Sequence, residues 1–124
     1  MSILDTIVKR KKEWVESQKQ LVPLSALKKA EMYQRSPLSL SSRISNGNGS
    51  GIIAEFKRKS PSKGNINITA EVVEVTQGYQ INGASAVSIL TDIDFFGGSD
   101  QDLIAARKQL SIPILRKDFI IDEY

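Results

Sequence analysis

Three charged residues stand where apolar segments of the sequence end. Glu55 and Lys57 close the segment IIAEFK, and Lys117 closes the segment ILRK. A carboxylate and an ammonium two residues apart on a strand point to the same side, so Glu55 and Lys57 can form an ion pair. A lysine that faces inward beside a second ammonium, as Lys117 would, is placed to act as a general acid. When such a pattern stands alone, a strand-end ion pair or a solvated lysine without a chemical task is the commoner explanation.

Two glycine-containing segments could receive an anion. The segment KRKSPSKG (57–64) offers basic side chains and serine hydroxyls that suit phosphate or carboxylate, although it lacks the P-loop pattern. The segment FFGGS (95–99) places two glycines before a helix start, and helix N-termini attract anions. The simpler alternatives are an exposed basic loop, a nucleic-acid patch, and a turn that glycine permits.

Strands and helices alternate in the second part of the chain. We expect strands at 52–57, 85–92 and 112–119, a helix that Thr69 caps and that stops at Asn82-Gly83, and a helix capped by Ser99 with Asp102. This order predicts an α/β protein with a parallel sheet and right-handed crossovers. Each strand is apolar through its body and turns polar at its carboxyl end, where parallel α/β proteins assemble their active sites.

The first part of the chain has a different character. Ser2 and Asp5 can cap an amphipathic helix over residues 2–19, whose basic run Lys9–Lys12 suits a solvated helix face. A second helix is predicted over 25–34, and the serine-, asparagine- and glycine-rich residues 36–51 are expected to form a loop. The predicted domains are therefore a helical extension with a linker over 1–50 and an α/β region over 51–124.

Composition excludes several classes of site. The 124 residues include neither cysteine nor histidine, so zinc fingers and Ser-His or Cys-His catalysis are excluded. No apolar run approaches the roughly 20 residues of a membrane-spanning helix. The formal charge of +3 is compatible with a small anionic ligand and does not demand nucleic acid or a membrane surface. A cytoplasmic protein is expected.

Taken together in this order, the motifs resemble one family. The segments IIAEFKRKSPSKG, GASAVSILTD, FFGGS and PILRKDFIIDEY are similar to the stretch from the first to the third strand of indole-3-glycerol phosphate synthases. This resemblance implies a (β/α)8 TIM-barrel fold, of which the chain holds the N-terminal helical extension and the first three parallel strands. It also implies a carboxy-lyase of tryptophan biosynthesis.

The resemblance further implies roles for individual residues. The family closes the ring of 1-(o-carboxyphenylamino)-1-deoxyribulose 5-phosphate and releases carbon dioxide and water, with no cofactor and no metal. By motif match, Lys117 would be the acid at the sugar carbonyl, and Lys57, oriented by Glu55, would assist the dehydration. Three further residues match positions that bind the substrate: Ser60, Phe96 and Phe119.

A complete barrel takes roughly 200–250 residues. We therefore expect a truncated chain that is inactive alone and could self-associate through open sheet edges, and a monomeric full-length enzyme without nucleic-acid or membrane partners. One alternative is another phosphosugar barrel enzyme, such as a phosphoribosyl isomerase. The other is a non-catalytic basic domain that binds nucleic acid or a protein through Lys9–Lys12 and Lys57–Lys63. Binding that weakens steeply with salt would favour that last alternative.

Overall fold

A computed structural model describes residues 1–124, which form two compact units. One unit consists of Met1–Ser36 with Phe119–Tyr124, and the other of Pro37–Asp118. The boundary predicted at residue 50 separates a helical extension from the α/β region. The two compact units are defined in a different way, so this boundary stays a prediction.

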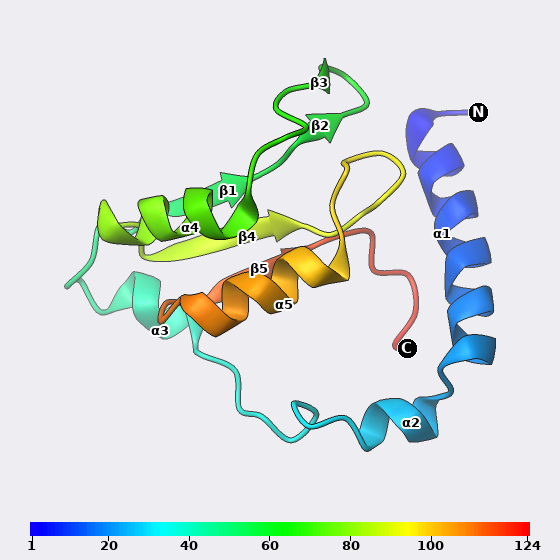
Figure 1. The fold of residues 1–124 in the computed structure, drawn as a ribbon, viewed down its shortest axis with the longest axis horizontal. Helices are drawn as coiled ribbons and strands as arrows, with labels where there is room; N and C mark the ends of the chain where they lie inside the picture. Colours follow the sequence, from blue (N-terminus) through cyan, green and yellow to red (C-terminus); the bar gives the residue numbers. More distant parts are fainter. The chain divides into compact units, whose positions relative to one another are not determined.

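The larger unit contains a three-stranded parallel sheet (Figure 1). Its strands are β1 (Ile53–Phe56), β4 (Ala86–Leu90) and β5 (Ile114–Lys117), in the order β1-β4-β5. Each observed strand lies inside a predicted segment. The α/β class with parallel strands is thus confirmed.

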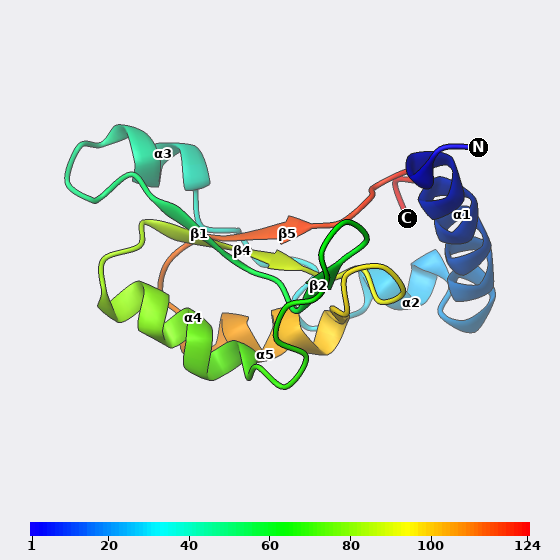
Figure 2. The same ribbon diagram turned by 90° about the horizontal axis from the view of Figure 1, so that it is seen from above.

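Two helices connect these strands and cover one face of the sheet. They are α4 (Val72–Ile81) and α5 (Asp100–Gln109), and Figure 2 shows both on the same side. Apolar side chains that point to this side make the hydrophobic core, because burying them removes apolar surface from water. The core residues are Phe56, Val72, Ala84, Val87, Ile89, Ala106, Leu110 and Ile112.

The capping of these helices agrees with the sequence in part. Ser99 caps α5 by accepting a hydrogen bond from the backbone N–H of Asp102 at 3.1 Å, as predicted. The predicted cap of α4 is wrong, because that helix begins at Val72 with Glu71 before it. The hydroxyl of Thr69 instead donates to the side chain of Asn67 at 3.2 Å. Such local side-chain bonds compete with helix formation.

Short elements occur where only loops were expected. Residues 40–45 of the predicted linker form α3 (Leu40–Ser45), so the loop prediction is wrong there. Ser39 caps this helix by accepting a hydrogen bond from the backbone N–H of Ser42 at 3.2 Å. Serine is common both at helix caps and in loops, so the serine-rich composition suggested a loop here. In Figure 2, α3 lies on the side of the sheet opposite to α4 and α5. A small antiparallel hairpin joins β2 (Lys59–Ser60) to β3 (Gly64–Asn65) within the basic segment.

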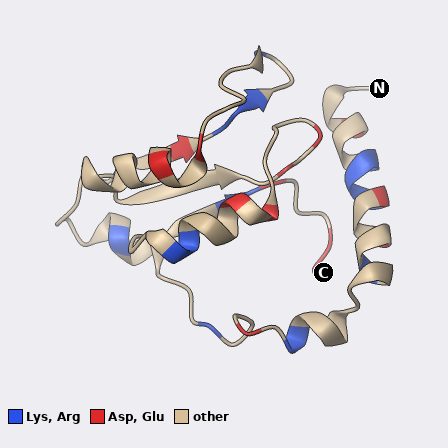
Figure 3. Cartoon of the chain, viewed as in Figure 1, with Lys and Arg blue, Asp and Glu red and all other residues tan.

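The smaller unit is built on α1 (Ile3–Leu21), which begins with the predicted capping box. Ser2 and Asp5 exchange hydrogen bonds of 2.9 and 3.1 Å between side chain and backbone. Both basic and acidic residues occur along this helix (Figure 3), and Arg10 forms an exposed ion pair with Glu13, as expected of a solvated face. None of the helices combines the length and apolar character needed to cross a bilayer.

The second predicted helix is shorter than expected. It spans α2 (Leu24–Lys28), and the backbone hydrogen bonds that follow join residues three apart, as in tight turns. The C-terminal residues pack within the same unit. Lys19 Nζ lies 2.9 Å from Asp122 Oδ2, and the hydroxyl of Tyr124 donates to the carbonyl of Val22 at 2.5 Å.

Candidate active site

Polar side chains gather on the face of the sheet that α4 and α5 leave uncovered. In the register of the sheet, Glu55 lies opposite Ser88, and Leu90 lies opposite Lys117. Partners in a parallel register point to the same side, and side chains alternate along each strand. Glu55, Ser88 and Lys117 therefore share one face near the carboxyl ends of the strands.

One oxygen of Glu55 joins this group together. Its Oε2 accepts a hydrogen bond from Lys117 Nζ at 2.9 Å and another from the hydroxyl of Ser88 at 3.0 Å. The side chains of Lys117 and Glu55 remain 54% and 29% exposed, so the ion pair is open to a molecule that approaches from solvent.

The pKa of Glu55 reflects two opposing effects. Burial by itself raises the pKa of this carboxyl, because a charge is less stable away from water. The hydrogen bonds from Lys117 and Ser88, with the attraction of the Lys117 and Lys57 charges, outweigh burial and lower the pKa below its ordinary value. Glu55 is consequently an anion at neutral pH.

Lys57 acts on this carboxylate through its charge, but it is not the hydrogen-bonded partner that the sequence suggested. Sequence alone paired Glu55 with Lys57, its neighbour two residues on. In the structure the hydrogen-bonded ammonium is that of Lys117, and Lys57 contributes an electrostatic attraction. The sheet explains this, because β4 places Glu55 and Lys117 on either side of Ser88, whereas Lys57 follows the last residue of β1. Two ammonium groups thus act on one carboxylate.

The three predicted substrate-binding residues belong to other segments of the chain than the strands that carry this cluster. Ser60 is buried in β2, where its hydroxyl accepts a hydrogen bond from the backbone N–H of Lys63 at 3.2 Å and shapes the hairpin. Phe96 is half-buried in the loop between β4 and α5. Phe119 is half-buried in the smaller unit. Their roles toward a substrate stay predictions.

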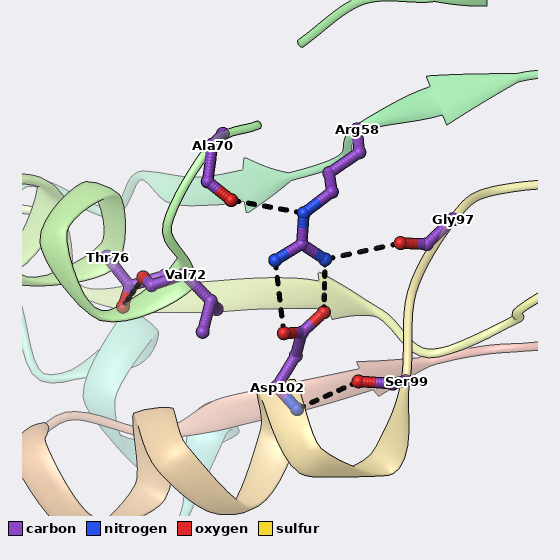
Figure 4. A network of polar contacts seen from close by, with 7 residues as sticks. All are labelled: Arg58, Ala70, Val72, Thr76, Gly97, Ser99 and Asp102. Atoms are coloured by element: carbon purple, nitrogen blue, oxygen red, sulfur yellow. Dashed lines mark hydrogen bonds and ion pairs between the residues drawn. The ribbon is translucent and has the colours of Figure 1, made fainter. Parts of the chain in front are cut away.

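A guanidinium network that the sequence did not reveal ties the loops above the sheet together (Figure 4). The side chain of Arg58 donates to the carbonyls of Ala70 at 3.1 Å and Gly97 at 3.2 Å. It also makes a two-pronged ion pair with Asp102, in which Nη2 lies 3.1 Å from Oδ1. The hydrogen bond to Asp102 raises the pKa of the guanidinium further, so its charge is fixed. Arg58 thereby links the segment after β1 to the start of α5.

The loop after β4 depends on a close approach of two backbones. The N–H of Gly98 donates to the carbonyl of Asp92 at 2.8 Å, and the N–H of Phe95 donates to the Asp92 carboxylate at 2.8 Å. A Cβ atom on Gly98 would lie 2.0 Å from the carbonyl oxygen of Leu90, so no larger residue fits there without a shift. The sequence indicated a glycine turn but not this contact.

The chain is similar throughout to proteins of one kind. The family model described as indole-3-glycerol phosphate synthase matches residues 4–124. Three curated proteins of that name are similar to it. The one from Bacteroides thetaiotaomicron is 49% identical over 98% of this chain and 46% of its own length. Those from Carboxydothermus hydrogenoformans and Legionella pneumophila are 41% and 40% identical over 98% and 99% of this chain, and over 48% and 47% of their own lengths. The chain therefore spans about half the length of the curated relatives it matches.

Proposed function

The chain belongs to the indole-3-glycerol phosphate synthase family, and we propose that the whole protein converts 1-(o-carboxyphenylamino)-1-deoxyribulose 5-phosphate into indole-3-glycerol phosphate. The observation that carries the proposal is the ion pair of Lys117 and Glu55, which stands open to solvent where parallel strands end. Active sites of such sheets form at this end. The pair offers a proton donor and the carboxylate that holds this donor within reach of a substrate.

Ring closure would use Lys117 as the acid. The ring carbon that bears the carboxylate attacks the ketone carbon of the sugar, and a carbon–carbon bond forms. The ammonium of Lys117 transfers a proton to the ketone oxygen, which becomes a hydroxyl. The Glu55 carboxylate accepts a charge-assisted hydrogen bond from the Lys117 ammonium and so holds it in position before the transfer.

The two remaining bond cleavages restore aromaticity. The carboxylate leaves as carbon dioxide, and its bonding electrons return to the benzene ring. Lys57 would then protonate the new hydroxyl so that it leaves as water, while a base removes a proton from the carbon next to nitrogen. The steps are the formation of a carbon–carbon bond, heterolytic cleavages and proton transfers, and none of them needs an oxidant or a reductant, so we propose no cofactor and no metal. In this scheme Ser60, Phe96 and Phe119 contact the substrate.

The finer classification follows from this chemistry. An enzyme that breaks a carbon–carbon bond to release carbon dioxide is a carboxy-lyase, and this one would serve tryptophan biosynthesis. We propose that it works in the cytoplasm as a monomer on a small phosphosugar–anthranilate substrate, without nucleic-acid or membrane partners. Ring contacts from aromatic side chains would hold the anthranilate moiety.

The test is a product assay with the protein expressed from the whole coding region. The purified protein should release one carbon dioxide for each indole product, which the ultraviolet absorbance and fluorescence of indole report. The 124-residue chain provides a second sample, from which no turnover is expected. The proposal is refuted if the whole protein leaves the substrate unchanged while the Bacteroides thetaiotaomicron relative, assayed in parallel, consumes it.

A further inference from the structure

We propose that Ser88 is a positioning residue of this site, which holds the carboxylate of Glu55 in place so that Glu55 can in turn hold Lys117; this inference rests on the proposed function. Ser88 lies on β4, the central strand of the sheet. Its hydroxyl is the neutral donor to Glu55, whereas Lys117 is the charged one.

The surroundings of Ser88 leave its hydroxyl buried and bonded to Glu55. On the same face of β4 its neighbours are Ala86 and Leu90, both apolar, and Ser88 itself is only 3% exposed. A buried hydroxyl without a partner costs free energy, and Glu55 is the side chain to which this hydroxyl donates. This hydrogen bond therefore satisfies the buried hydroxyl of Ser88 and also restrains the side chain of Glu55.

Both donors converge on a single oxygen. The hydroxyl of Ser88 and the ammonium of Lys117 reach Oε2 of Glu55, so the position of this oxygen is restrained from two strands at once. An ionised carboxylate only accepts hydrogen bonds, and this arrangement suits the ionised form.

The two donors differ in what the reaction does to them. When Lys117 gives its proton to the substrate, it loses its charge and much of its attraction for Glu55. The hydroxyl of Ser88 carries no charge to lose, so it keeps the carboxylate in position until Lys117 is protonated again. Lys57, the other charged group that acts on Glu55, contributes attraction but no hydrogen bond that fixes an orientation.

The experiment compares Ser88→Ala with Ser85→Ala in the whole protein. Ser85 is an equally buried serine just before β4, but its hydroxyl accepts a hydrogen bond from the N–H of Gly51 at 2.9 Å and does not contact Glu55. Circular dichroism establishes that each variant is folded. Two quantities are then measured: the steady-state constants, and the pKa of Glu55 from the pH dependence of its carboxyl carbon signal in nuclear magnetic resonance.

Ser88→Ala should lower kcat about tenfold or more with little change in KM, because a hydrogen bond to a charged group is lost. It should also raise the pKa of Glu55 and move the acid limb of the pH–rate profile upward. Ser88→Cys keeps the size and a weak donor, so its kcat and pKa should fall between those of the serine and alanine forms. Ser85→Ala should leave both unchanged.

Three results would overturn the inference: an unchanged pKa of Glu55, an unchanged kcat, or the same losses in Ser85→Ala. If the wild-type protein makes no indole product, the proposed function fails instead. The titration still decides in that case, since it reports whether Ser88 holds Glu55 without requiring turnover.

Discussion

The ammonium of Lys117 and the carboxylate of Glu55 lie 2.9 Å apart although 62 residues separate them in the sequence. The strands that carry them, β1 and β5, are not neighbours, and β4 stands between them. Long side chains bridge that distance because both point to the same face near the same edge of the sheet. The pair therefore couples the folding of three strands to the assembly of the site.

The first prediction concerns acid. Since the pKa of Glu55 is lowered on folding, its ionised form stabilises the folded state, and this contribution is complete above the ordinary pKa of 4.5. It should be lost as the pH falls from there through the lower pKa of the folded protein. Urea unfolding at a series of pH values should show a steeper loss of stability below that point for wild type than for Glu55→Gln. Glu74→Gln, on an exposed part of α4, is the control and should follow wild type.

The second prediction contrasts two glycines. Gly98→Ala would place a methyl group 2.0 Å from the Leu90 carbonyl oxygen, and we expect it to lower the free energy of unfolding by about 1–3 kcal/mol, as overpacking does. Gly78→Ala, within α4, adds a methyl with no atom within 4 Å and should raise stability by about 0.5–1 kcal/mol. Denaturant titrations measure both. Equal effects at the two positions would contradict the close approach at Gly98.

The third prediction concerns the Arg58 network. The side chains of Arg58 and Asp102 are only 18% and 12% exposed, so Asp102→Asn leaves a partly buried guanidinium without its counter-charge. We expect a loss of about 1–3 kcal/mol in the free energy of unfolding. Asp100→Asn, which breaks the exposed ion pair of Asp100 with Arg116, should cost less than about 1 kcal/mol.

A double-mutant cycle with Arg58→Met checks that the two residues act as a pair. The loss caused by Asp102→Asn should shrink when Arg58 is already replaced, because no unpaired charge then remains. Additive losses would show that Asp102 acts mainly through its position in the first turn of α5.

The sequence alone predicted the strands and the helix that build this site, because these elements follow from residue patterns within short segments. Apolar segments that turn polar at their ends identified the strands that carry Glu55 and Lys117, and Ser99 identified the start of α5. The family resemblance predicted the barrel type of the fold, and the match over residues 4–124 confirms it.

What the sequence missed depends on contacts between distant residues. The partner of Glu55 was expected two residues away but lies two strands away, and Ser88 carries no local signal of its role. Arg58 likewise looked like one more residue of a basic loop, since its carboxylate partner is 44 residues further along. Pairings of this kind follow from strand order and register, which a single sequence does not specify.

The last prediction separates catalysis from binding at Lys117. In the whole protein, Lys117→Ala should lower kcat by about a hundredfold or more, the usual contribution of a general acid, while KM changes far less. Lys108→Ala, at an exposed position near the end of α5, is the control and should leave both constants near wild type. Steady-state assays of indole formation give both constants. A rise in KM with kcat preserved would mean that Lys117 binds the substrate in its ground state and that the proton comes from elsewhere, for which Lys57, the other ammonium that acts on Glu55, is the next candidate.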